Sequence, residues 1–217
     1  MALGCGLLAS LSPAGATVIF DNLGTTPADP DNIQPANTGA QRFKATDVGE
    51  LSSIVLKLGT ITGGGTETFT LKLYSDAATG GLNGGPAPDT ALATLASVQF
   101  QSLTADANNT FSPGAYDLSA NTYYWIVAQA TADGVRWMFD ANDLQNGSGA
   151  GFDAHSAVSG NSGTTWNDTL GYPYLMSLEL TAVPEPGTWL AGGFIALFAA
   201  GQVGMGFLKR RKAAAAK

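Results

Sequence analysis

Short stretches in which apolar and polar residues alternate recur between residues 17 and 180. Alternation with a period of two predicts β-strands with one buried face, because successive side chains of a strand point to opposite sides of a sheet. The clearest run is 68–74, where Phe69, Leu71 and Leu73 are separated by Thr and Lys. Further strands are predicted at 54–58, 121–130, 135–140 and 174–180, and less regular ones at 17–20, 41–45, 96–100 and 151–155. The stretch 121–130 is apolar at successive positions, which is typical of a central strand covered on both faces.

Clusters of Gly, Asn, Asp and Pro separate these stretches and predict turns. They lie at 27–30, 63–65, 80–88, 108–109, 146–151 and 159–163. Outside the C-terminal region no stretch of about 11 residues has helical periodicity, although 90–96 fits a single helical turn. Many short strands with this spacing predict an all-β fold, and we expect a jelly-roll-like two-sheet β-sandwich over residues 17–183.

An uncharged apolar run, 187–208, lies close to the C-terminus. At about 1.5 Å per residue, this run forms a helix of roughly 33 Å, which is enough to cross a bilayer core of about 30 Å. A basic cluster follows, made of Lys209, Arg210, Arg211 and Lys212. By the positive-inside rule this cluster stays in the cytoplasm. We therefore expect one C-terminal transmembrane helix, with the residues before Pro184 outside the cytoplasm and 213–217 as a tail without recognisable chemistry.

Small residues recur at every fourth position of the predicted membrane helix. They are Gly192, Ala196, Ala200 and Gly204. Such a stripe lets two helices approach closely in lipid, where hydrophobicity does not drive them together. We interpret it either as a docking face for a membrane partner or as a chance feature of a helix rich in Gly and Ala.

The N-terminal segment 1–16 is apolar, rich in small side chains, and ends in Ala14-Gly15-Ala16. This ending fits the A-x-A pattern of a signal-peptidase site, so Ala14 and Ala16 predict cleavage before Thr17. The segment is short and has no Lys or Arg near its amino end, which a start codon placed a few residues too late would explain. A buried N-terminal strand is the alternative. Because Cys5 is the only cysteine and leaves with the signal, we expect a mature domain without disulfides or cysteine-based metal sites.

Charge is distributed unevenly along the chain. Five of the ten Lys and Arg residues follow residue 208, whereas all 17 Asp and Glu residues precede residue 187. The segment up to Pro186 therefore carries five basic residues against 17 acidic ones, a net charge of −12. Such a surface repels nucleic acid and anionic lipid, so neither is an expected partner. It favours divalent-cation binding, contact with polysaccharide, or simply solubility outside the cell.

The C-terminal order of Val183-Pro184-Glu185-Pro186, apolar span and Arg-rich end resembles the PEP-CTERM sorting signal of Gram-negative bacteria that produce exopolysaccharide. The resemblance implies recognition by an exosortase, a membrane-embedded cysteine transpeptidase-like enzyme, and cleavage near the motif. The sorting signal then covers 184–212, with Pro184, Glu185 and Pro186 as its motif. Each Pro fixes φ and lacks an N–H, which keeps the motif extended for a processing enzyme. The alternative is an ordinary membrane anchor that follows a Pro-rich linker.

The order of the predicted strands is similar to that of the choice-of-anchor domains, notably the type R group, which occur with several C-terminal sorting signals. The residues that carry this resemblance are 20–22, 51–58, 69–76, 86–95 and 121–127, and it covers about residues 17–183. Its motifs are core strand patterns without a catalytic signature. The resemblance implies a bacterial surface β-domain.

Few residues fit a catalytic role. His155 is the only histidine, which excludes a His-rich zinc site, and it lies in a Gly/Ser/Ala region without a recognisable partner. No G-x-S-x-G motif occurs, although Ser148, Ser156 and several Asp residues leave a catalytic triad open in composition. Paired glycosidase carboxylates require a separation that sequence does not give. We expect that the protein is not an enzyme, and a secreted hydrolase is the least favoured alternative.

Two loops carry clusters of oxygen-bearing side chains. Asp29 and Asp31 share one turn, and Asp140, Asn142, Asp143 and Asn146 share another. The second loop begins like an EF-hand, but Leu144, Gln145 and Gly151 stand where that motif requires an acid or amide, a Gly and a Glu. The EF-hand interpretation therefore fails. Two interpretations remain, a structural Ca²⁺ held by the four aspartates from non-contiguous loops, or Asp and Asn as turn formers. No other cofactor is expected.

Aromatic side chains are the remaining candidates for ligand contact, because they stack on sugar rings when several reach one exposed face. Trp125 and Trp137 lie in apolar strands, which predicts that they belong to the core. Trp166 lies in the polar run 164–168, and we expect it to be exposed and to contact sugar. Packing inside the domain is the alternative.

Together these features predict an exported protein with a structural or adhesive role in exopolysaccharide or biofilm. We expect export across the inner membrane, transient anchoring with the C-terminus in the cytoplasm, exosortase processing, and a final position at the cell surface or outside the cell. The expected partners are the exosortase, the membrane before processing, and exopolysaccharide. A carbohydrate-binding module at the cell surface is the alternative function.

Overall fold

The structure is a computed structural model that describes residues 15–28, 30–140 and 147–183. Residues up to Ala182 belong to one compact unit, and Val183 begins a second one. Several predicted features lie outside the described residues: Ala14, Asp29, Asp143, and everything from Pro184 onward, including the small-residue stripe and the basic cluster. Within the described ranges, no helix is long and apolar enough to span a membrane.

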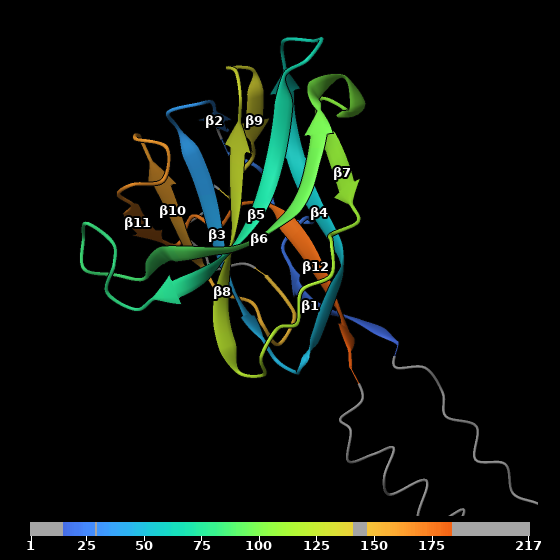
Figure 1. Cartoon of the computed structure of the whole chain (residues 1–217), viewed down its shortest axis with the longest axis vertical. Helices are drawn as coiled ribbons and strands as arrows, with labels where there is room; N and C mark the ends of the chain where they lie inside the picture. The colour runs from blue at the N-terminus through green and yellow to red at the C-terminus, as the bar shows by residue number, and fades with distance from the viewer. Residues whose placement is uncertain (1–14, 29, 141–146, 184–217) are drawn as a thin grey trace, which may run out of the picture. The chain divides into compact units, whose positions relative to one another are not determined.

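The described part of the chain is all-β, as predicted, and its strands form two antiparallel sheets (Figure 1). Sheet 1 has the order β1-β12-β4-β9-β2, and β7 also pairs with β4. Its strands are β1 Ala16–Asp21, β2 Asp31–Ile33, β4 Gly49–Ile61, β7 Ala107–Phe111, β9 Val135–Trp137 and β12 Met176–Ala182. Sheet 2 has the order β11-β10-β3-β8-β5-β6. Its strands are β3 Thr38–Ala45, β5 Thr68–Ala77, β6 Ala87–Gln99, β8 Thr122–Ala130, β10 His155–Ser159 and β11 Asn167–Leu170, and a 3-10 turn, η1 Phe100–Ser102, follows β6.

Four of the strand pairs are nested along the chain. β1 pairs with β12, β3 with β8, β4 with β7, and β5 with β6. Among these strands the first in sequence therefore pairs with the last, and the pairing continues inward to the two in the middle. The chain follows the course of one long antiparallel hairpin whose segments are divided between sheet 1 and sheet 2.

The core between the two sheets is built from the alternating positions that the sequence pattern predicts. Leu56 of β4 and Leu71 of β5 are both fully buried and belong to one apolar cluster that joins the sheets. The intervening positions Lys57 and Lys72 are only partly buried, because they point to the outer faces. Burial of a Leu side chain stabilises a fold by about 1.5–3 kcal/mol. This repeated burial holds together a domain whose described residues contain no cysteine.

Strand β8 lies between β3 and β5 and is buried on both faces. Tyr124 and Ile126 belong to the core between the sheets, whereas Trp125 and Val127 belong to a second cluster on the outer face of sheet 2. The continuous apolar run at 121–130 is explained by this double burial, and the prediction of a central strand is confirmed.

Three local predictions are wrong. The stretch 90–96 is not a helical turn but part of β6, whose pairing with β5 contains several register shifts. Asn108 and Asn109 do not form a turn, since both lie in β7, where the Asn109 side chain accepts from Thr104 N at 2.7 Å and donates to Thr104 O at 2.8 Å. The strand expected at 151–155 begins only at His155.

Candidate functional site

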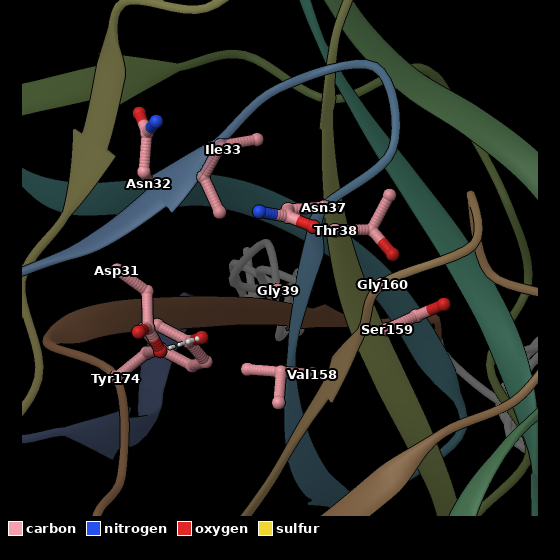
Figure 2. Close-up of a pocket in the computed structure, with 10 residues that line it drawn as sticks. All are labelled: Asp31, Asn32, Ile33, Asn37, Thr38, Gly39, Val158, Ser159, Gly160 and Tyr174. Atoms are coloured by element: carbon pink, nitrogen blue, oxygen red, sulfur yellow. Dashed lines mark hydrogen bonds between the residues drawn. The ribbon is translucent and has the colours of Figure 1, made fainter.

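A cavity of about 240 Å³ lies where β2 of sheet 1 approaches β3 and β10 of sheet 2 (Figure 2). Figure 2 shows Asp31 and Tyr174 on one side of the cavity and Thr38 and Ser159 on the other. Ile33 and other apolar groups complete the lining. The cavity therefore combines an apolar wall with a few polar groups, one of which is a carboxylate.

Tyr174 and Asp31 form a hydrogen bond inside this cavity. The Tyr174 hydroxyl donates to Oδ2 of Asp31 at 2.5 Å, and the Tyr174 ring stacks on Trp137 with 4.3 Å between the centroids. Burial, followed by the charge of the Asp31 carboxylate, raises the pKa of Tyr174 well above its usual value. Gly39 permits this arrangement, because a Cβ there would lie 2.9 Å from the Tyr174 hydroxyl oxygen. Tyr174 thus acts as a protonated donor and not as a base.

Two of the aspartates proposed as calcium ligands lie in or next to the paired strands β2 and β9. Asp31 is opposite Trp137, and an isolated bridge joins Pro27 to Asp140, which is fully buried. The other two, Asp29 and Asp143, lie outside the described residues. Within the described ranges, no group of three or more His, Cys, Asp or Glu side chains is arranged to hold a metal ion. The calcium site stays a prediction.

A charged network occupies the outer face of sheet 2. Arg42 contacts Asp76 at 2.7 Å and Asp153 at 3.4 Å, and each of the three side chains is only about one-tenth exposed. Trp125 Nε1 donates to Oδ1 of Asp76 at 2.8 Å. The ring of Tyr123 lies 3.9 Å from the Arg42 guanidinium carbon, a cation–π contact. Because the partners of Arg42 already satisfy it, this network stabilises the sheet and does not present a free charge to a ligand.

His155 joins the same network at its edge. Its Nδ1 lies 2.7 Å from Oδ1 of Asp153. The neighbouring Ser156 hydroxyl donates to the backbone oxygen of Tyr172 at 2.9 Å. Among the described residues, His155 therefore has a carboxylate partner but no hydrogen bond to a Ser hydroxyl, and this geometry does not support a Ser-His-Asp arrangement.

The expectation that Trp166 is exposed is wrong, since only 4% of the residue is exposed. It packs with Trp125 and Ala157 in the second apolar cluster. The loop at 80–85 is hydrogen bonded to the segment that carries Trp166, with Leu82 N donating to Trp166 O at 2.8 Å and Asn83 N donating to Oδ1 of Asp168 at 3.1 Å. The polar residues next to Trp166 in the sequence are hydrogen bonded to this loop. A polar run of sequence can therefore contain a buried indole. Trp125 and Trp137 are fully buried, as predicted.

Two exposed aromatic residues contact other side chains of the domain. Tyr123 is 36% exposed and stacks on Arg42, whereas Tyr172 is 39% exposed and packs edge-on against Phe139. Each of these two rings therefore already has a contact within the domain, and the sugar-contact interpretation stays a prediction.

A second concave site, which we call the sheet 2 groove, lies on the outer face of sheet 2. It has a volume of about 380 Å³ and is lined by Pro35, Thr70, Lys72, Gln129, Ala130, Thr131 and Ser162. The lining includes a lysine but no carboxylate. The charge of the groove is therefore opposite to that of the cavity at Asp31.

Comparison with known proteins gives no further assignment. No family model matches the chain, and no curated protein matches it. Any functional conclusion rests on the residues themselves.

Sequence reasoning singled out Asp31 of the cavity as a candidate ligand but missed the other lining residues and the groove. Thr38 and Ser159 line the cavity together only because β3 pairs with β10, and Gln129 and Ser162 line the groove together only because the loop after β10 lies near β8. The one usable signal was the outward position of Lys72 in an alternating strand. No local sequence pattern predicts which polar residues of other strands and loops lie around Lys72.

Proposed function

We propose that this protein is exported across the inner membrane of a Gram-negative bacterium and processed by an exosortase at a PEP-CTERM signal, 184–212. The observation that carries the proposal is the order of Pro184-Glu185-Pro186, apolar span and basic cluster at the C-terminus. The span is long enough for one membrane helix, and the basic cluster fixes its orientation. The β-domain is then delivered to the cell surface or beyond it, after transient anchoring.

In this proposal the domain is a jelly roll of the choice-of-anchor type with a structural or adhesive role in exopolysaccharide or biofilm. The nested strand pairs support the jelly-roll assignment, since they divide one long hairpin between two packed sheets. The Ser156 hydroxyl donates to a backbone oxygen and His155 contacts Asp153, and this arrangement favours the non-enzymatic role over a hydrolase.

Two features of the fold are compatible with processing at both ends of the domain. Ala16 lies opposite Thr181 in the pairing of β1 with β12, so cleavage before Thr17 and cleavage near Pro184 adjoin the same end of one strand pair. The buried hydrophobic residues of the described core lie between Ile19 and Leu180. Removal of the flanking segments therefore takes away none of these side chains.

Mass spectrometry of the protein purified from a host that carries an exosortase tests the proposal. We expect a mature N-terminus at Thr17 and a C-terminus near Pro184-Glu185-Pro186. The double variant Pro184→Ala/Pro186→Ala should accumulate unprocessed, whereas Pro113→Ala, a proline exchange outside the motif, should be processed normally. A wild-type chain that keeps 187–217 in the presence of exosortase would contradict the proposal, as would a reporter fused after Leu180 that is active only in the cytosol.

A further inference from the structure

The sheet 2 groove is a concave site in which the local charge differs from that of the whole domain. Lys72 lies in it, and no carboxylate lines it. The ion pairs of the described residues involve Arg42, Asp76, Asp153 and His155, so none of them neutralises Lys72. Charges farther apart than about 8 Å are largely screened at physiological salt. We therefore expect the lining, which includes a cation and no carboxylate, to favour an anionic group of a ligand.

The polar groups around Lys72 can donate hydrogen bonds into the groove. The Thr131 hydroxyl oxygen accepts from Thr68 N at 2.8 Å, which leaves its own O–H free to donate. Gln129 brings an amide with two donor hydrogens and one acceptor oxygen. The Ser162 hydroxyl donates to Pro35 O at 2.8 Å and so presents its oxygen as an acceptor. This set is suited to a ligand that carries both an anionic group and hydroxyl groups.

The wall of the groove is held in place before any ligand binds. The loop after β10 is tied to the loop before β3, because Ser162 N donates to Ala36 O at 2.8 Å. Inside the same loop, the Ser159 hydroxyl oxygen accepts from Gly163 N and the Asn161 side chain accepts from Thr165 N, both at 2.9 Å. A wall that is already ordered reduces the entropy cost of binding.

We propose that the sheet 2 groove binds the carboxylate of a hydroxylated ligand, and that the ligand class is the uronic-acid unit of an acidic polysaccharide. The Lys72 ammonium forms a charge-assisted hydrogen bond with the carboxylate. Gln129 and Thr131 bind the ring hydroxyls. This inference names a ligand site for the matrix role, but it depends only on the groove and not on the sorting signal.

Calorimetric titration of the full-length chain in detergent micelles with oligogalacturonate tests the inference. Maltooligosaccharide of the same length is the neutral control, and inorganic phosphate is the free anion. We expect oligogalacturonate to bind at least tenfold more tightly than either. Lys72→Gln should weaken the binding of oligogalacturonate at least fivefold relative to the wild type. Gln129→Glu, which adds a carboxylate to the groove, should weaken this binding more than Lys72→Gln does. Lys57→Gln, the matched exchange on the outer face of sheet 1, should change it less than twofold.

Several results would overturn the inference. Oligogalacturonate that does not bind the wild-type chain would exclude the site, and equal binding of maltooligosaccharide would exclude the role of the carboxylate. Phosphate that binds as tightly would show a site for free anions and not for a sugar. An equal loss in Lys57→Gln would show unspecific attraction by surface charge. Thermal melting of each variant distinguishes loss of ligand binding from loss of the fold. Neither the titrations nor the melting curves depend on exosortase processing, so the inference and the proposed function are tested separately.

Discussion

Arg42 and Asp76 form a two-point ion pair on the outer face of sheet 2. The Nε and Nη2 atoms of Arg42 donate to the two carboxylate oxygens of Asp76 at 2.9 and 2.7 Å, and Asp76 also accepts from Trp125. The pair joins β3 to β5 across the central strand β8. It therefore connects strands that do not hydrogen bond to each other through their backbones.

Removal of one partner of this pair should destabilise the domain strongly. Loss of one partner of a buried ion pair costs about 3–5 kcal/mol. Without Asp76, Arg42 keeps Asp153 at 3.4 Å but loses its two-point partner, and the Trp125 indole loses its acceptor. Asp76→Ala should lower the free energy of unfolding by that amount in urea denaturation, whereas Asp117→Ala, an exposed carboxylate, should change it by about 0.5 kcal/mol or less. The double variant Arg42→Met/Asp76→Leu should lose less than Asp76→Ala alone. Equal effects of Asp76→Ala and Asp117→Ala would contradict this account.

Replacement of Trp166 should act on stability because the residue is buried. Trp166→Ala removes a large side chain from the second apolar cluster, and such changes cost about 3–5 kcal/mol. Leu82→Ala is the control, since Leu82 is 70% exposed and its truncation should cost about 0.5 kcal/mol or less. Chemical denaturation of both variants measures the difference. A Trp166→Ala variant as stable as the wild type would show that the indole is not part of the packed structure.

Alkaline pH should destabilise the domain through Tyr174. Its pKa is raised in the folded state, so the folded protein holds the hydroxyl proton more tightly than the unfolded chain does. The resulting stability is fully present below the unfolded pKa of about 10 and decreases as pH rises above it. Unfolding free energies measured across this range should fall less steeply in Tyr174→Phe. A smaller slope should remain, because burial also raises the pKa of Tyr74. An unchanged slope in Tyr174→Phe would contradict this assignment.

Gly134 occupies a position that no other residue fits. Its φ is +141°, and a Cβ there would overlap the carbonyl oxygen of Thr62. Thr62 N also donates to Gly134 O at 2.7 Å, so the two segments cannot separate without losing a hydrogen bond. Gly134→Ala should cost about 1–3 kcal/mol or more in unfolding free energy. Gly24→Ala, where a Cβ meets open space, should have little effect, and similar losses for both variants would argue against this reason.

The fragment 17–183 should fold alone. The buried hydrophobic side chains of the described core lie within it, and β1 and β12 close sheet 1 on each other. We expect its unfolding free energy to match that of the full-length chain within about 1 kcal/mol. A further truncation at 175 removes β12, which lies between β1 and β4, and should abolish cooperative unfolding. A fragment 17–183 without a cooperative transition would show that the flanking segments contribute to folding.

The sequence predicted strands well where one face of the strand is buried and the other faces solvent. Leu56 and Leu71 belong to such strands, and their alternation alone fixed the buried face. The prediction failed in β6, an edge strand with bulges and mostly partial exposure, because there the pattern carries little alternation. It also failed at Asn109, whose side chain satisfies backbone groups of the preceding turn from within a strand.

The candidate sites were less predictable than the strands for a physical reason. The segment that carries Trp166 is hydrogen bonded to a loop about 80 residues earlier in the sequence, through Leu82 to Trp166 O and through Asn83 to Asp168. No local pattern near Trp166 records this contact. Similarly, Asp31 looked like a free loop carboxylate, and only the approach of Tyr174 shows that one of its oxygens is already occupied.

The nested strand pairs also set the order in which the domain can be completed. The strand that pairs with β1 along its length is β12, almost the whole domain later, so this pairing is among the most sequence-distant contacts of the described residues. Contacts of this kind form slowly, because the entropy of closing a long loop is lost before the contacts stabilise the chain. A chain that emerges amino end first from a ribosome or a translocation channel therefore leaves one edge of β4 unpaired until β12 has emerged. The last segment of the domain to appear is the one that locks it.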